Sequence, residues 1–285
     1  MNDPVHAPHD GPCDHDHGNE GFESYENLAV ERADGVVTIR INRPAKMNAL
    51  SRDTLIELDC VIGDAQDDAE VGAIIITGAD TGKKPSFVAG ADIAELAEMN
   101  VLELRTHGQL GQAVFSAIEN SAKPVIAAIN GFAFGGGLEL AMACHVRYAS
   151  KDALMGQPEI NLGLIPGFAG TQRLARLVGR GRALEILLTG DPIGAEEACR
   201  LGLVNKTFES AVLQAETLGL ALKLAGKAPV ARMAIIEAVV RGGSMGFADA
   251  QSLEADLFGM MASTEDTKEG LAAFLAKRKP TWKGE

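Results

Sequence analysis

Between about residue 25 and residue 209, the hydrophobic pattern alternates between short apolar runs and helical stripes. The runs Val71–Thr77 and Val125–Ile129 have the length and apolar character of strands that are covered on both faces. Between such runs, apolar residues recur three or four positions apart, as in Leu55, Leu58 and Ile62. Strands that alternate with helices predict an α/β fold with a mainly parallel sheet.

The two ends of the chain follow other patterns. From residue 210 to residue 285 only helical spacing remains, which predicts a helical region that must pack against something else to be stable. Residues 1–24 are polar, lack periodicity and hold His6, His9, His15 and His17. This composition predicts a disordered His-rich tail, and weak metal capture by the tail is the alternative. No metal site is predicted.

Composition narrows the range of partners. The chain has 285 residues and a formal net charge of -13, which argues against nucleic acid or an anionic membrane surface as a partner. No apolar run is long enough to span a membrane. The four cysteines are scattered and form no CxxC pair, which favours reduced thiols over a disulfide framework. A cytoplasmic enzyme is the expectation.

The candidate chemistry lies between Pro124 and Gly170, where two glycine-rich turns each precede or carry a carboxylate. Gly135–Gly137 leads into a predicted helix with Glu139 in its first turn, and Glu159 lies in the second turn. Two carboxylates that converge from separate turns suit general acid–base catalysis. A third glycine turn, near Ala91, can direct a backbone N–H at a ligand, and two such donors would form an oxyanion hole.

Several other motifs do not predict a functional site, because their spacing or their sequence context is wrong. The triple glycine lacks the G-x-G-x-x-G spacing of dinucleotide sites, and Gly78–Lys84 departs from the phosphate-loop pattern. Gly242–Gly246 matches G-x-S-x-G, but it follows a helical pattern and no histidine comes after His145 to complete a triad. His107 and His145 stand alone, so both are interpreted as surface or satisfied core histidines.

From about residue 25 to residue 279, the chain resembles the crotonase, or enoyl-CoA hydratase/isomerase, superfamily. The motifs that carry the resemblance are NRPAKMNALS (42–51), FVAGADI (87–93), KPVIAAINGFAFGGGLELAMACHVRYAS (123–150), MGQPEINLGLIPGFAGTQRL (155–174), LTGDPIGAEEACRLGLVNK (188–206) and EGLAAFLAKRKPTW (269–282). The resemblance implies a spiral of ββα turns over residues 25–209. It also implies a helical trimerisation region over residues 210–285, in a homotrimer or a hexamer.

The resemblance also implies roles for individual residues. The N–H groups of Ala91 and Gly136 would bind the thioester oxygen, and Glu139 and Glu159 match the two catalytic glutamates of the hydratases. The implied substrate- and CoA-binding residues are Lys46, Ala89, Gly90, Asp92, Ile93, Gly167 and Lys277. Lys277 would act from a neighbouring subunit, and Lys46 departs mildly from the family, whose basic residue can lie one position earlier.

The implied activity is reversible hydration of a trans-2-enoyl-CoA to a 3-hydroxyacyl-CoA in fatty-acid or related acyl-CoA breakdown. No cofactor is expected, because CoA is part of the substrate. The alternatives are an enoyl-CoA isomerase and a non-catalytic binding protein on the same scaffold. Isomerases can keep only the position of Glu159, so the presence of Glu139 as well favours hydration. Side chains near 99–110 and Phe168 are expected to shape the acyl pocket.

Overall fold

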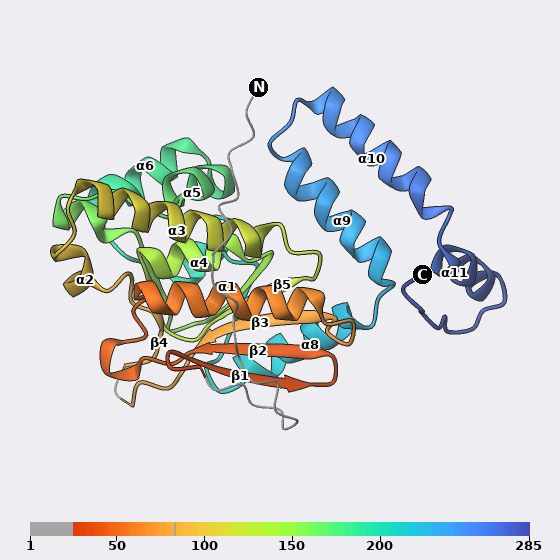
Figure 1. Ribbon diagram of the computed structural model, residues 1–285, viewed down its shortest axis with the longest axis horizontal. Coiled ribbons are helices and arrows are strands. Elements are labelled where there is room, and N and C mark those ends of the chain that lie inside the picture. Colours follow the sequence, from red (N-terminus) through yellow and green to blue (C-terminus); the bar gives the residue numbers. More distant parts are fainter. Residues whose placement is uncertain (1–24, 83) are drawn as a thin grey trace.

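The computed structural model describes residues 25–82 and 84–285 as two sheets surrounded by helices (Figure 1). The expected tail, residues 1–24, lies outside the described residues. In spatial order, the larger sheet consists of β1 (Leu28–Ala33), β2 (Val36–Ile41), β3 (Ala73–Gly78), β5 (Val125–Ile129), β7 (Val146–Ser150) and β10 (Lys206–Phe208). The smaller sheet consists of β4 (Ser86–Val88), β6 (Phe132–Phe134), β8 (Leu154–Gly156) and β9 (Ile193–Gly194). Only the β1–β2 and β8–β9 pairs are antiparallel among these described strands.

The chain winds as a spiral, because it visits one strand of each sheet before each helical segment. The pairs β3–β4, β5–β6 and β7–β8 each place their first strand in the larger sheet and their second in the smaller. The helices of this part are α1 (Arg52–Asp67), α2 (Ile93–Ala97), α3 (Val101–Glu119), α4 (Gly136–Ala143), α5 (Gly170–Val178), α6 (Arg180–Thr189) and α7 (Ala195–Arg200). Short 3-10 helices, η1 (Pro44–Lys46) and η2 (Pro158–Leu162), complete it. The α/β spiral implied by the resemblance is therefore confirmed.

Local sequence signals account for the boundaries of several elements. The β1–β2 hairpin turns through Asp34 and Gly35, whose φ angles of 51° and 73° give the left-handed geometry that tight hairpins favour. Ser51 caps α1 by accepting the N–H of Thr54 at 3.2 Å. The strands β3 and β5 are buried along their whole length, as expected from their apolar runs.

Helices cover both faces of the larger sheet. The main core packs side chains of α1, α3 and α4 against it, and a second apolar cluster joins the other face to Leu213 and Ala221 of α8 (Leu213–Ala225). The remaining helices, α9 (Pro229–Gly242), α10 (Phe247–Met261) and α11 (Glu265–Leu275), extend away from the sheets (Figure 1). They expose large apolar side chains, including Ile235, Val239, Phe247, Phe258 and Phe274.

Two further predictions from the sequence concern membrane-spanning helices and the state of the cysteines. In the described part of the chain, no helix is both long enough and apolar enough to cross a membrane. Cys144 and Cys199 are free cysteines, as expected.

Candidate active site

Glu139 is fixed at the start of α4, where the chain turns sharply out of β6. The turn passes through Gly135, whose φ of 50° and ψ of -124° suit glycine alone. Glu139 is 1% exposed, and its Oε1 accepts the backbone N–H groups of Phe168 at 2.8 Å and Gly170 at 2.7 Å. The carboxylate is therefore held at one oxygen and leaves the other available to a ligand.

The loop that holds Glu139 is itself held from behind. Arg173 donates through Nη1 to the carbonyl oxygen of Phe168 at 2.8 Å and through Nη2 to Glu119 at 2.9 Å. A Cβ atom on Gly170 would lie 2.7 Å from Cγ and Oε1 of Glu139. A side chain at position 170 would therefore displace the carboxylate.

Glu159 enters the same region from η2. The amide of Gln157 lies against the Glu159 carboxylate. Its Nε2 is assigned to that side because the opposite assignment makes two acceptors face each other, and it then donates to the carboxylate oxygens at 2.8 Å and 3.1 Å. A Cβ atom on Gly135 would lie only 2.9 Å from Oε1 of Glu159. Glu159 thus lies directly against the glycine turn that begins α4.

Both glutamates have strongly raised pKa values. Burial, followed by the nearby charge of Glu159, raises the pKa of Glu139 from 4.5 to about 7, against the opposing effect of the amides of Gly170 and Phe168. Burial also raises the pKa of Glu159 to about 7. Two interacting carboxylates with such values titrate as a pair, and near neutral pH the pair holds about one proton.

The predicted oxyanion donors come from two turns that approach each other. Ala91 forms an isolated parallel bridge with Leu50, in which the N–H of Leu50 donates to Gly90 and that of Asp92 donates to Leu50, both at 2.8 Å. Because N–H directions alternate along an extended segment, the N–H of Ala91 points away from Leu50. A Cβ atom on Gly136 would lie 3.5 Å from the nitrogen of Ala91. The N–H of Gly136 is one of the first in α4 and has no acceptor within that helix.

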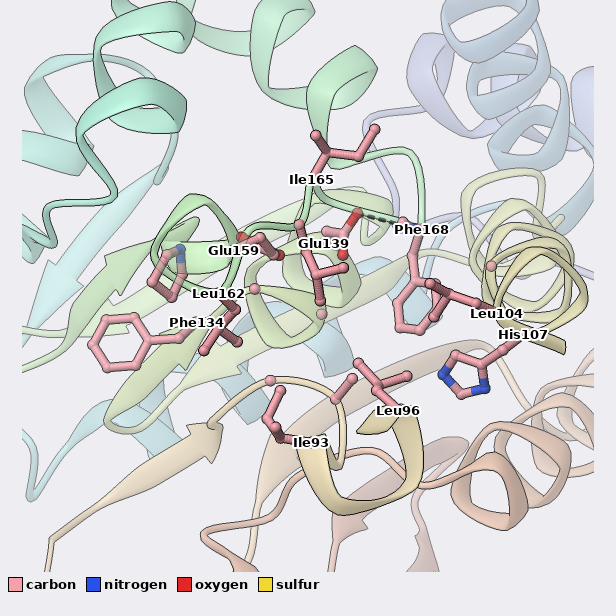
Figure 2. A pocket seen from close by; sticks show the side chains of 18 of the residues that line it. Ile93, Leu96, Leu104, His107, Phe134, Glu139, Glu159, Leu162, Ile165 and Phe168 are labelled. Atoms are coloured by element: carbon pink, nitrogen blue, oxygen red, sulfur yellow. Dashed lines mark hydrogen bonds between the residues drawn. The ribbon is translucent and has the colours of Figure 1, made fainter. Parts of the chain in front are cut away.

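Glu139, Glu159, Ala91 and Gly136 all line one cavity of about 310 Å³ (Figure 2). The other residues that line it are Ala89, Gly90, Ile93, Leu96, Leu104, His107, Gly108, Phe134, Gly135, Pro158, Leu162, Leu164, Ile165, Gly167 and Phe168. The structure therefore gathers the predicted reactive groups in one place, together with the predicted Ala89, Gly90, Ile93 and Gly167. As expected, Phe168 and side chains from 99–110 form part of the wall.

Lys46, Asp92 and Lys277 do not line this cavity. Asp92 caps α2 by accepting the N–H of Ala94, and it pairs with Arg43 at 2.9 Å. Burial opposes its ionisation, but the hydrogen bond from Arg43 and nearby positive charge lower the pKa of Asp92 overall. Asp92 thereby fixes the turn that carries Ala91. Lys46 and Lys277 are exposed, and their predicted contact with CoA stays a prediction.

The sequence interpretation is confirmed for His145 and wrong for His107. His145 is a satisfied, partly buried histidine, with Nδ1 accepting the N–H of Val125 at 2.9 Å and Nε2 3.0 Å from the carbonyl oxygen of Glu119. His107 is buried in the cavity wall without a hydrogen bond from the described residues, so its interpretation as a surface or satisfied residue is wrong. The interpretation also missed the amide of Gln157, whose place two residues before Glu159 was the available signal.

Comparison with known proteins identifies the family. A sequence model described as enoyl-CoA hydratase/isomerase matches residues 31–285. The chain belongs to this family. A short-chain-enoyl-CoA hydratase from Clostridium acetobutylicum is 49% identical over 253 residues, covering 89% of this chain and 96% of its own length. A crotonyl-CoA hydratase from Syntrophomonas wolfei is 48% identical, covering 90% of this chain and 97% of its own length.

Solved structures of relatives have the same fold. A crystal structure of an enoyl-CoA hydratase from Bacillus anthracis superposes with a TM-score of 0.87 at 39% identity, covering 91% of this chain and 100% of the other. A second structure, of an enoyl-CoA hydratase from Geobacillus kaustophilus, gives a TM-score of 0.86 at 39% identity, with coverage of 92% and 99%. The membership thus rests on sequence and structure alike.

Proposed function

We propose that the chain is an enoyl-CoA hydratase, a carbon–oxygen lyase that adds water reversibly across the 2,3 double bond of a trans-2-enoyl-CoA. The observation that carries the proposal is the shared cavity, in which Glu139 and Glu159 meet the backbone turns of Ala91 and Gly136. The names of relatives at 48–49% identity support the same reaction. The names also favour a short acyl chain.

In the proposed reaction, the thioester oxygen accepts the N–H groups of Ala91 and Gly136. As water attacks the β-carbon, negative charge moves onto this oxygen and the thioester becomes enolate-like. Donors that are fixed in advance stabilise that charge, and in related oxyanion sites the loss of one donor costs about 3 kcal/mol of barrier. The first turn of α4 adds the favourable end of its helix dipole.

The two carboxylates handle the water and its protons. Glu139, held at Oε1 by two amides, orients the water and removes a proton from it. Glu159 shares the water and supplies the proton to the α-carbon. This division requires one ionised and one protonated carboxylate. Because both pKa values are raised to about 7, the pair holds about one proton near neutral pH, and either glutamate can carry it.

The proposal extends to assembly, location and the CoA moiety. Exposed apolar residues on α9, α10 and α11, such as Val239, Phe258 and Phe274, support assembly into a homotrimer or hexamer. The acidic, ordinary globular composition supports a cytoplasmic location, and the names of the similar hydratases support a role in acyl-CoA breakdown. Lys46, Asp92 and a neighbouring subunit's copy of Lys277 are proposed to flank the CoA.

The test is an ultraviolet assay that follows loss of the conjugated enoyl thioester over trans-2-enoyl-CoA substrates of increasing length. The variant Glu159→Gln should fold normally and lose turnover by about 10²- to 10⁴-fold, the usual contribution of a general acid–base group. Glu196→Gln on α7 is the matched control, because Glu196 is exposed and does not line the cavity. A Glu159→Gln enzyme with the wild-type rate would refute the assignment.

The same assay separates hydration from the isomerase alternative. With a 3-enoyl-CoA, an isomerase would shift the double bond faster than it hydrates a 2-enoyl-CoA. We expect the reverse, because both carboxylates border the cavity and can share one water. Faster isomerisation would reassign the reaction within the family.

A further inference from the structure

His107 is a buried polar side chain in the cavity wall that the reaction above does not use. It is 5% exposed, and within residues 25–82 and 84–285 neither Nδ1 nor Nε2 has a hydrogen-bond partner. Figure 2 shows its ring extending from α3 toward the side chains of Leu96 and Leu104. Neighbouring atoms cover both nitrogens, and a buried imidazole without partners costs stability. Its place in the wall of a binding cavity points to a ligand that displaces these neighbours and completes its hydrogen bonds.

The other described histidine, His145, shows that this fold can satisfy a partly buried imidazole. Both ring nitrogens of His145 lie within hydrogen-bond distance of backbone groups, the N–H of Val125 and the carbonyl of Glu119. The lack of partners at His107 is therefore specific to the cavity wall. It is not a general feature of how the fold accommodates histidine.

His107 lies on α3, across the ring of Phe168 from the oxyanion turn. Its ring packs against Phe168 with centroids 5.4 Å apart, and a Cβ atom on Gly136 would lie 3.1 Å from the same phenyl ring. The ring of Phe168 thus separates His107 from the oxyanion turn. This separation argues against a role for His107 at the thioester oxygen or at the attacking water.

The rest of the wall offers few polar side chains. Among the described residues that line the cavity, polar side chains come only from His107, Glu139 and Glu159. The two glutamates are committed to the proposed reaction, so His107 is the remaining polar side chain in the wall. Leu96, Leu104 and Phe168 around it would make an apolar environment in which a single hydrogen bond discriminates strongly.

We propose that His107 is a specificity-determining residue, which hydrogen-bonds a neutral oxygen near the end of the acyl chain and selects hydroxyl-bearing enoyl-CoA substrates over apolar chains of equal length. The proposal deepens the hydratase function and rests on it. A neutral imidazole offers one donor and one acceptor, which matches a hydroxyl group.

The charge around His107 favours a neutral oxygen over a carboxylate. Burial lowers the pKa of His107, with Glu95 raising it and Arg52 lowering it further, so the ring is neutral at pH 7. A neutral ring offers no charge to pair with an acyl carboxylate. Glu139 and Glu159 in the same cavity would repel one.

The experiment compares pairs of trans-2-enoyl-CoA substrates in which a terminal hydroxyl replaces a terminal methyl. The pairs are 4-hydroxybutenoyl with pentenoyl, 5-hydroxypentenoyl with hexenoyl, and 6-hydroxyhexenoyl with heptenoyl. The readout is the ratio of kcat/KM within each pair. Three lengths are used because the reach from the double bond to His107 selects one of them.

In the wild-type enzyme, kcat/KM should be higher for the hydroxyl substrate than for its methyl counterpart at one of the three chain lengths. His107→Phe should lower that ratio by about tenfold, the worth of one hydrogen bond in a dry site, mainly through slower turnover of the hydroxyl substrate. His107→Gln, which keeps a donor and an acceptor, should retain most of the preference. Leu104→Met alters the same wall without altering its hydrogen bonding, so the ratio should persist.

An unchanged kcat/KM ratio in His107→Phe at every length would overturn the proposal. An equal loss of kcat/KM for both substrates of each pair would also overturn it, because such a loss indicates a structural role for His107. Calorimetry on the wild-type enzyme adds a test that needs no variant. It compares 6-hydroxyhexanoyl-CoA with heptanoyl-CoA and their shorter counterparts, and equal affinities throughout would also overturn the proposal. If wild-type enzyme hydrates none of the substrates, the hydratase function itself fails.

Discussion

Replacing Glu139 with glutamine should make the protein more stable at pH 8 while removing its activity. Glu139 is 1% exposed, and burial together with the charge of Glu159 raises its pKa from 4.5 to about 7. Glutamine has nearly the same shape, and its carbonyl oxygen can still accept the N–H groups of Phe168 and Gly170. The substitution therefore removes the buried charge with little change in packing.

The size and sign of the effect follow from proton linkage. Below pH 4.5, Glu139 is protonated in both the folded and the unfolded chain, so the glutamine gains nothing there. Between pH 4.5 and about 7, the folded protein keeps a proton that the unfolded chain has lost, so stability falls as the pH rises. A shift of this size makes the ionised carboxylate cost the folded state roughly 3 kcal/mol at pH 8.

The measurement is the free energy of unfolding in urea at fixed protein concentration, for wild type and Glu139→Gln, from pH 5 to pH 8. We expect the two proteins to be similar at pH 5 and the variant to be more stable by roughly 3 kcal/mol at pH 8. Glu196→Gln controls for a change of net charge and should stay within about 0.5 kcal/mol of wild type. A Glu139→Gln protein that is no more stable than wild type at pH 8 would refute the reasoning.

Two further substitutions test how Glu139 is held. Gly170→Ala should reduce kcat at least about tenfold, because the new Cβ would lie 2.7 Å from the Glu139 carboxylate. Steady-state kinetics on crotonyl-CoA measure this effect, and an unchanged kcat would contradict it. Arg173→Met should lower the free energy of unfolding by about 2 kcal/mol, because it removes charged hydrogen bonds to Phe168 and Glu119. Urea titration measures this loss. A loss below about 0.5 kcal/mol would show that Arg173 does not hold the loop.

The sequence predicts the larger sheet better than the smaller one. Strands such as β3 and β5 are continuous apolar runs of five or six residues, and such runs predict buried strands directly. The strands β4 and β6 have three residues each, too few for any period to be visible, and β6 directly precedes the glycine turn. Their pairing depends on contacts between distant segments, which a local pattern does not contain.

The candidate site also contains some features that a local sequence pattern predicts and others that depend on the folded structure. Glu139, Glu159 and the glycine turns were predictable because each is a local feature, a residue type in a turn or at a helix start. The state of His107 was not, because a lone histidine at helical spacing gives the same sequence signal whether or not its nitrogens are paired. The raised pKa of Glu139 depends on burial and on Glu159, which lies 20 residues further on, so it also needs the folded structure.

The loop that contains Phe168 joins the two halves of the proposed function. Its backbone N–H holds Glu139, and its phenyl ring lies between the oxyanion turn and His107. The ring also packs at 5.4 Å against Phe115 of the core, and Arg173 fixes the carbonyl behind it, so the loop is restrained on three sides. A shift of this ring to admit a different acyl chain would move the amide that positions Glu139. Under the proposed function, acyl selectivity and the position of the Glu139 carboxylate would therefore be coupled through this loop. A polar group such as His107, on the other side of the ring, would alter selectivity without moving the loop.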